Sequence, residues 1–251
     1  MVEKHFDINE DGYSIRCLIY CEKNPRDAKD FVIATYGFGG NKENHPVKTF
    51  AERIISKYKH FAVICFDWPC HGADARNKLI LSECMTYFDL VIRYAKNELR
   101  AEHLYTYGTS FGGYITLKYL PEQGNPFDKI ALRCPAIKMY DIMASRITDD
   151  EWKKLNRGKE ILRGYSRKIK ITKEFLDELK EGDLTKYEYF DFADDILVLQ
   201  GTKDEFVSID DVRKFCDDNV IEMIPVENAD HPFSDPHIMD TAIAKIIDFF
   251  G

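Results

Sequence analysis

Short apolar runs alternate with longer amphipathic segments along most of this chain. The apolar runs are rich in β-branched, aromatic and aliphatic residues and occupy residues 31–37, 61–68, 103–110, 129–136, 195–201 and 219–226. Near-continuous runs of this length are typical of strands buried on both faces of a parallel sheet. Helical periodicity is found between them, over residues 46–58, 81–99, 111–120, 208–218 and 239–250. Pro121 is expected to end the third of these helices. The alternation predicts βαβ units, and therefore an α/β fold with a mostly parallel, doubly wound sheet.

Two stretches depart from this alternation. Near the N-terminus, apolar residues on both sides of Asp11-Gly12 predict two antiparallel strands joined by a tight turn. The second stretch, residues 137–193, is too long for an ordinary connection between a strand and a helix. It predicts helices that open on Thr148 and Thr172. We interpret residues 1–251 as a single domain with this insertion either as a cap over a site at the strand ends or as a packing decoration.

Candidate chemistry begins at Gly108-Thr109-Ser110-Phe111-Gly112, between a predicted strand and a predicted helix. This is the context of a nucleophile elbow, in which a serine occupies a tight, strained turn. Glycine on either side of the turn removes side chains that would clash, and the helix N-terminus favours negative charge at the serine. An ordinary turn with an inert serine is the alternative interpretation.

A serine hydroxyl needs an adjacent base, and the base needs a third group to orient it. In this fold the chain order is serine, then acid, then histidine. After Ser110 only His231 and His237 remain, and we prefer His231 because its loop follows a predicted strand. Asp204 follows the strand at 195–201 and is the preferred acid, with Glu205 as the fallback.

An oxyanion hole requires two backbone N–H groups directed at the developing charge. One is expected from Phe111, directly after the nucleophile, and the other from Phe38 in the glycine-rich loop after the first long buried strand. Tyr36, Gly37 and Gly39 of that loop are expected to contact substrate, because glycines allow close approach of the backbone.

With these residues in place, the chain resembles the α/β-hydrolase superfamily. It is most similar to small bacterial esterases of the feruloyl/cinnamoyl type and to serine-aminopeptidase-like hydrolases. The resemblance is carried by GTSFGG at the elbow, Tyr36–Gly40, Asp67–Gly72, Gly201–Val207 and Ala229–Phe233. Tyr36 replaces a usual histidine and Cys70 a usual glycine, which implies an altered pocket. His71 has a structural role in this pattern.

Composition excludes several classes of protein. A formal net charge of −8 argues against a nucleic-acid binder. The sequence has neither a run long enough to span a membrane nor an apolar region of the signal-peptide type, so we predict a cytoplasmic protein without a membrane partner. The seven cysteines lack metal-ligand spacing and are expected to be buried thiols, with Cys70 the one candidate for reactivity.

These observations predict a serine hydrolase that cleaves a carboxylic ester of a small or aromatic acyl group through an acyl-enzyme. Thioester or amide hydrolysis by the same residues is one alternative, and a non-catalytic binding protein on the same fold is another. The expected partner is a small-molecule ester; no metal or cofactor is implied, and the sequence does not indicate an oligomeric state. Basic residues concentrated in 153–173 form either a solvated helix face or an attractant for anionic substrates.

Overall fold

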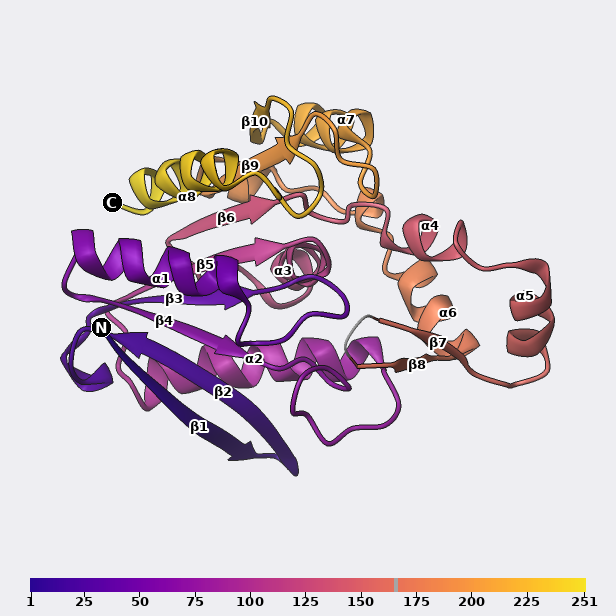
Figure 1. Ribbon diagram of the computed structural model, residues 1–251, viewed down its shortest axis with the longest axis horizontal. Helices are drawn as coiled ribbons and strands as arrows, with labels where there is room; N and C mark the ends of the chain where they lie inside the picture. The colour runs from indigo at the N-terminus through magenta and orange to yellow at the C-terminus, as the bar shows by residue number, and fades with distance from the viewer. Residues whose placement is uncertain (165–166) are drawn as a thin grey trace.

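An eight-stranded sheet forms the centre of the molecule (Figure 1). The computed structural model describes residues 1–164 and 167–251. The strand order is β1-β2-β4-β3-β5-β6-β9-β10. The bounds are β1 Val2–Glu10, β2 Tyr13–Cys21, β3 Asp30–Thr35, β4 Phe61–Phe66, β5 His103–Thr109, β6 Lys129–Arg133, β9 Ile196–Gly201 and β10 Glu222–Val226. β1 pairs antiparallel with β2, as does β2 with β4, and every other neighbouring pair is parallel. The predicted mostly parallel sheet with an N-terminal hairpin is therefore confirmed.

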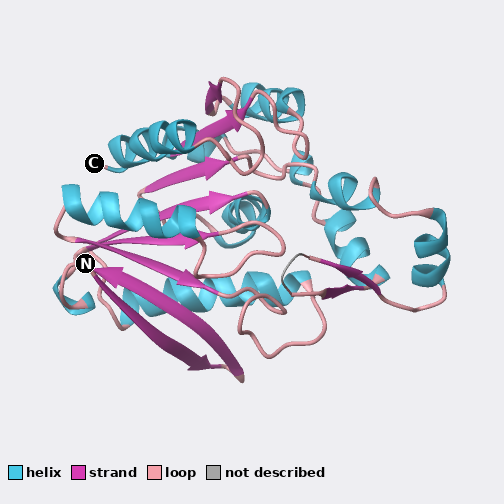
Figure 2. Ribbon diagram, viewed as in Figure 1, coloured by secondary structure: helices cyan, strands magenta, loops and turns pink. Residues whose placement is uncertain are grey.

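Helices cover both faces of the sheet (Figure 2). One face packs against α1 (His45–Lys57) and α8 (Pro236–Phe250), and the other against α2 (Leu81–Asn97), α3 (Phe111–Gln123) and α7 (Ile209–Asn219). Successive residues of a central strand such as β3 belong to opposite cores, since side chains alternate between the faces of a sheet. This double burial explains why the strands appear in the sequence as continuous apolar runs.

Helix α3 does not end before Pro121, contrary to the sequence prediction, but continues to Gln123. A proline inside a helix leaves the carbonyl four residues earlier without its N–H partner. Here the hydroxyl of Tyr189 donates to that carbonyl, on Leu117, at 3.1 Å. A contact from a distant part of the chain therefore compensates for the lost hydrogen bond.

Two boundaries near the C-terminus also differ from the prediction. The apolar run at 219–226 is not all strand, because Asn219 closes α7 and Val220 adopts a left-handed φ of 59° before β10 begins at Glu222. Helix α8 begins at Pro236, three residues before the predicted start at Met239. The Asp235 side chain accepts from the N–H of His237 at 2.8 Å and so caps the helix.

Most of the described part of residues 137–193, called the cap segment below, lies beyond the carboxyl ends of the parallel strands, and its last residues return to the start of β9 (Figure 1). The cap segment contains α4 Met139–Ala144, α5 Asp149–Asn156, β7 Ile161–Arg163, β8 Ile169–Ile171, α6 Lys173–Glu181 and the 3₁₀ turn Leu184–Lys186. A second 3₁₀ turn, Phe190–Asp195, begins inside the cap segment and ends beyond it. The helices that open on Thr148 and Thr172 are confirmed, whereas α4 and the β7–β8 hairpin were not predicted.

Tyr165 and Ser166, which fall inside the predicted insertion, lie outside the described residues. Within the described ranges, no helix combines the length and apolar character needed to cross a bilayer.

Candidate active site

Ser110 lies at the turn between β5 and α3, with φ 53° and ψ −113°. Its N–H donates to the carbonyl of Arg133 at 3.1 Å, and its carbonyl accepts from Tyr114 at 2.9 Å, so the unusual backbone conformation is held from both sides. A Cβ on Gly112 would lie 2.4 Å from Thr35 Oγ1, which explains the need for glycine there. The turn therefore presents the serine hydroxyl at the edge of the sheet, as the elbow motif predicts.

The structure brings Ser110, His231 and Asp204 into one hydrogen-bonded relay. Ser110 Oγ lies 3.0 Å from His231 Nε2, and His231 Nδ1 lies 2.7 Å from Asp204 Oδ2. These three side chains come from loops separated by up to 121 residues in sequence. The arrangement lets the imidazole accept a proton from the serine while its other nitrogen donates to a carboxylate.

Asp204 is held by the loop that follows β9. Its Oδ1 accepts from the N–H groups of Phe206 and Val207, each at 2.8 Å, and its Oδ2 accepts from Gln200 Nε2 at 3.1 Å. Burial alone would raise the pKa of Asp204, but the hydrogen bonds from His231 and Val207 outweigh burial and lower it. Glu205 is exposed and has no part in the relay, so the structure places the preferred acid, and not the fallback, beside the base.

The histidine loop rests on Arg133, a residue that the sequence analysis did not single out. Arg133 donates to the carbonyl of His231 at 3.3 Å, and its guanidinium carbon lies 4.9 Å from the ring centroid of Phe233. The ring of Phe206 packs against that of His231 in a tilted arrangement, with centroids 5.1 Å apart. The base is therefore fixed both by its backbone and by a neighbouring ring.

The two expected oxyanion donors come together beside the serine. Their side-chain rings lie 6.2 Å apart, and a Cβ on Gly37 would be 3.1 Å from Ser110 Cβ, so the Phe38 loop approaches the nucleophile closely. Within residues 1–164 and 167–251, neither the N–H of Phe38 nor that of Phe111 donates to another group of the protein. An oxyanion hole needs N–H groups of this kind, without an acceptor inside the protein.

A cavity of about 790 Å³ opens over Ser110 and His231. Its wall on the sheet side comes from the Tyr36–Gly40 loop, and the cap segment supplies Met139, Ile142 and Met143. The predicted contact residues Tyr36, Gly37 and Gly39 all line this cavity. Its size and largely apolar wall are typical of a site for a small organic ligand.

Comparison of the sequence with protein families matches residues 31–158 to the model described as the alpha/beta hydrolase fold. The matched region includes the elbow and the glycine-rich loop. The chain belongs to the α/β-hydrolase fold family. A search of curated proteins finds no match.

Solved structures of other α/β-hydrolase proteins resemble this one along its whole length. A protein of Agrobacterium vitis S4 that carries only the general name hydrolase has a TM-score of 0.80 and 17% identity, with 100% of both chains covered. Est1E from Butyrivibrio proteoclasticus, solved with ferulic acid bound, has a TM-score of 0.71 and 18% identity over 98% of this chain and 99% of that one. Mouse alpha/beta hydrolase domain-containing protein 10 has a TM-score of 0.72 and 14% identity over 98% of each chain. At these identities the likeness shows a shared fold.

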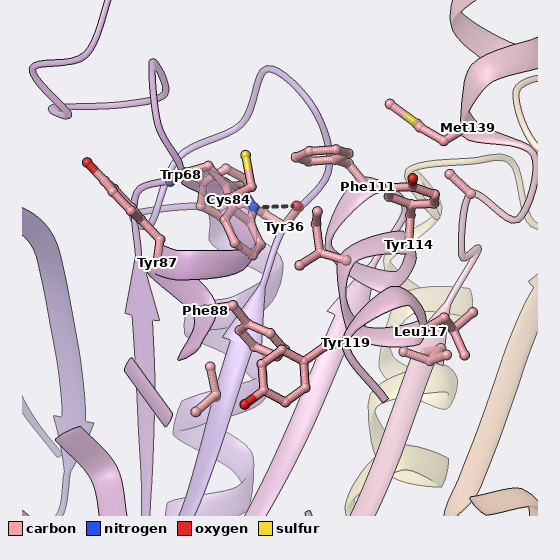
Figure 3. Close-up of a cluster of buried hydrophobic side chains, with 14 of the residues drawn as sticks. Tyr36, Trp68, Cys84, Tyr87, Phe88, Phe111, Tyr114, Leu117, Tyr119 and Met139 are labelled. Carbon is pink, nitrogen blue, oxygen red and sulfur yellow. Dashed lines mark hydrogen bonds between the residues drawn. The ribbon is translucent and has the colours of Figure 1, made fainter. Parts of the chain in front are cut away.

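Tyr36 and Asp67 belong to a buried hydrogen-bonded network at the start of the glycine-rich loop of this α/β-hydrolase. The Tyr36 hydroxyl donates to Asp67 Oδ1 at 3.3 Å and accepts from the N–H of Trp68 at 3.0 Å. Lys42 Nζ lies 2.9 Å from Asp67 Oδ2. The indole of Trp68 donates to the Tyr36 carbonyl at 3.3 Å, as Figure 3 shows. Both hydrogen bonds of the Tyr36 hydroxyl are therefore made to buried groups next to the glycine-rich loop, and other atoms of Tyr36 line the cavity.

Cys70 and His71 are buried beside this network. Burial raises the pKa of the Cys70 thiol to about 12, so the thiol stays protonated and unreactive near neutral pH. Burial also lowers the pKa of His71 to about 4, and its Nδ1 lies 2.9 Å from the carbonyl of Pro69. The ring of His71 packs edge-on against Phe38, with centroids 5.3 Å apart. A neutral, packed imidazole in this place agrees with the structural role implied by the resemblance.

Cys134, Asp204 and His231 form a group of potential metal ligands, whose ligand atoms lie within 4.8 Å of one another. Burial, reinforced by the charge of Asp204, raises the pKa of the Cys134 thiol well above its ordinary value. A protonated thiol is a poor ligand, and the other two groups are engaged in the relay. The donor set therefore fits a hydrogen-bonded acid–base pair better than a metal site.

The remaining candidates lie away from the relay. His237 is exposed at the start of α8 and does not line the cavity. Of the basic residues in 153–173, only Arg163 lines the cavity, and a bidentate ion pair with Glu151 at 2.8 and 2.9 Å neutralises it. The rest of this basic stretch does not face the site.

Proposed function

We propose that this α/β-hydrolase is a serine hydrolase that cleaves the carboxylic ester of a small or aromatic acyl group through an acyl-enzyme. The observation that carries the proposal is the relay of Ser110, His231 and Asp204 at the base of a cavity. A serine hydroxyl 3.0 Å from an imidazole that is itself oriented by a carboxylate has the geometry of an activated nucleophile.

The first half of the reaction forms the acyl-enzyme. His231 Nε2 accepts the proton of Ser110 as Oγ attacks the ester carbonyl carbon. The carbonyl oxygen becomes negative and accepts from the N–H groups of Phe38 and Phe111. The imidazolium then gives its proton to the departing alkoxide, the bond from carbon to the alcohol oxygen breaks, and the acyl group remains on Ser110.

Water completes the cycle by the same steps. His231 accepts a proton from water as its oxygen attacks the acyl carbon, and the same two N–H groups bind the second oxyanion. The proton returns to Ser110 Oγ as the carboxylic acid leaves. Asp204 remains ionised throughout, because its hydrogen bonds hold its pKa below the usual value, and it stabilises the imidazolium.

The cavity supports an organic ester as the substrate. Phe38 and Phe206 flank the relay and Met139 and Met143 approach from the cap segment, so an acyl chain or aromatic ring would be buried against apolar side chains. The structural likeness to Est1E, whose structure contains ferulic acid, agrees with an aromatic acyl group.

A panel of 4-nitrophenyl esters of rising acyl length, together with methyl cinnamates, a thioester and an aminoacyl amide, tests the proposal. We expect the wild type to hydrolyse esters fastest and Ser110→Ala to lose at least about 10⁵-fold in kcat. Ser234→Ala is the matched control, because Ser234 is exposed a few residues from His231, and it should retain activity. Hydrolysis that survives in Ser110→Ala, or a wild type that binds the esters without turnover, would overturn the proposal.

A further inference from the structure

Two arginines line the cavity over Ser110 without a carboxylate partner. Arg133 reaches it from the end of β6, and Arg146 reaches it from the cap segment. In the part of the chain that the structure describes, no aspartate or glutamate forms an ion pair with either guanidinium. This distinguishes them from Arg163 in the same cavity, which Glu151 neutralises.

Arg133 is a buried cation, with only 4% of its surface exposed. Its Nε donates to the Tyr107 hydroxyl at 3.1 Å and one terminal nitrogen donates to the His231 carbonyl at 3.3 Å, so both acceptors are uncharged. Burial alone would lower the pKa of Arg133, but Tyr107, Cys134 and Asp204 raise it, and the guanidinium stays charged. Taking a charge out of water is unfavourable unless an opposite charge is supplied, and Asp204 is already committed to His231.

Arg146 adds a second positive charge on the cap side. Its guanidinium carbon lies 3.9 Å from the ring centroid of Phe206, whose other neighbour is the His231 ring at 5.1 Å. Phe206 therefore lies between the Arg146 charge and the ring of the catalytic base. Glu205 is the acidic side chain that lines the cavity, and it is exposed.

We propose that Arg133 and Arg146 bind a carboxylate carried by the substrate, so that the preferred esters have a second, anionic group on the acyl or the alcohol side. Guanidinium groups are suited to this role because they offer several donors in a planar fork that matches a carboxylate. The burial of Arg133 lowers the local dielectric constant and strengthens its interaction with an anion. This inference rests on the proposed function and adds the substrate class to it.

Matched ester pairs test the preference. On the acyl side, 4-nitrophenyl hexanoate is compared with the 4-nitrophenyl monoester of adipic acid, which has the same chain length and a terminal carboxylate. On the alcohol side, 4-methylphenyl acetate is compared with 4-acetoxybenzoate. Each kcat/KM is divided by the rate of hydroxide hydrolysis of the same ester. We expect the anionic member of at least one pair to be preferred by about tenfold or more, and the preference to fall as salt rises.

The variants separate anion binding from support of the histidine loop. Arg133→Met should reduce the anionic-to-neutral ratio of kcat/KM about 10- to 100-fold, and Arg133→Lys should restore part of it. Arg146→Gln, a change at an exposed side chain, should reduce the ratio about 3- to 10-fold. Arg157→Gln is the control, since Arg157 is exposed in the basic stretch outside the cavity, and it should leave the ratio unchanged.

Binding gives a readout that does not depend on turnover. Calorimetry on Ser110→Ala should detect the adipate monoester, and adding Arg133→Met should weaken its binding at least tenfold. If Ser110→Ala binds the adipate monoester in this Arg133-dependent way but the wild type hydrolyses none of the esters, the proposed function is rejected and this inference stands. A wild type with no anionic preference in either pair, or an Arg133→Met that slows both members equally and leaves binding unchanged, would show that Arg133 only positions His231 and would overturn the inference.

Discussion

The floor of the site and the cap segment are built in different ways. The floor consists of loops at the carboxyl ends of β3, β5, β9 and β10, of which the first three strands are buried on both faces and β10 is a partly exposed edge strand. The cap segment consists of short helices and a hairpin whose strands have three residues each. The central sheet therefore positions Ser110, Asp204 and His231, whereas the cap segment contributes to the shape and charge of the cavity above them.

The attachments of the cap segment also differ from those of the floor. Arg167 donates to the carbonyls of His71 and Gly72 at 3.3 and 3.0 Å, which ties the cap to the loop after β4. Within the cap, Arg163 pairs with Glu151 across α5 and β7. These polar contacts join partly exposed groups, whereas buried cap side chains such as Phe175 and Leu176 belong to the same core as α2 and α3. Substitutions at the exposed positions of the cap should therefore reshape it with least effect on the fold.

The largest effect should come from removing the base in the floor. We expect His231→Ala to lower kcat for a neutral ester by at least about 10⁵-fold, because the nucleophile loses its proton acceptor. His237→Ala is the matched control, since His237 is exposed and lies outside the cavity, and it should keep wild-type activity. Equal losses in the two variants would mean that the histidine assignment is wrong. Steady-state kinetics on both purified proteins decides between them.

The acid should have the next largest effect. Asp204→Asn should lower kcat by about 10⁴-fold, because an amide cannot hold the imidazole in the correct tautomer or stabilise its charged form. Glu205→Gln, one residue away, should change kcat for the same neutral ester by less than about twofold, because Glu205 has no bond to His231. The reverse order of these two effects would contradict the placement of the acid.

Stability should distinguish floor from cap at matched glycines. A Cβ on Gly201, at the end of β9, would lie 2.4 Å from the backbone oxygen of Ala229, so Gly201→Ala should destabilise the fold by about 3 kcal/mol. Gly158 in the cap has φ 71° and nothing within 4 Å of an added Cβ, so Gly158→Ala should lose only about 1 kcal/mol. Urea unfolding measures both. Equal destabilisation would remove the distinction between the two regions.

The smallest expected effect is an acid-sensitive step confined to the cap. Hydrogen bonds from Arg163 and from the Thr148 N–H lower the pKa of Glu151 to about 2. Glutamate in the unfolded chain has a pKa of about 4.3. The stabilisation that ionised Glu151 gives the folded cap is therefore complete above that pH and is lost as the pH falls towards 2. We expect hydrogen exchange at 149–163, corrected for intrinsic rates, to accelerate relative to the central strands over that interval. Glu151→Gln should abolish this acid dependence, and an unchanged acid response in the variant would contradict the assignment.

The sequence predicted the floor far better than the cap, for physical reasons. Buried strands appear in the sequence as continuous apolar runs. A residue directly after such a run must lie at the carboxyl edge of the sheet, and for this reason Ser110 and Asp204 could be predicted. The choice between Asp204 and Glu205 needed the turn in which the N–H groups of Phe206 and Val207 converge on one carboxylate. Three-residue strands such as β7 have no detectable periodicity.

Arg133 shows a second kind of limit. The only signal for it in the sequence is a charged residue within the predicted strand run 129–136, where the surrounding residues are mostly apolar. The basic stretch at 153–173 was more visible but mostly faces away from the cavity. The density of charge along the chain therefore marks a mostly solvated face, as one of the two interpretations predicted, and the arginine beside the base is identified by its burial.

The central claim is that Ser110 is a nucleophile activated by His231, and labelling with a fluorophosphonate tests it most directly. Intact-mass spectrometry of the wild type should show one phosphonyl adduct, formed with loss of fluoride, and peptide mapping should place it on Ser110. Ser110→Ala should take up no label, and His231→Ala should label at a greatly reduced rate. An unlabelled wild type, or a full adduct on Ser110→Ala, would contradict the account.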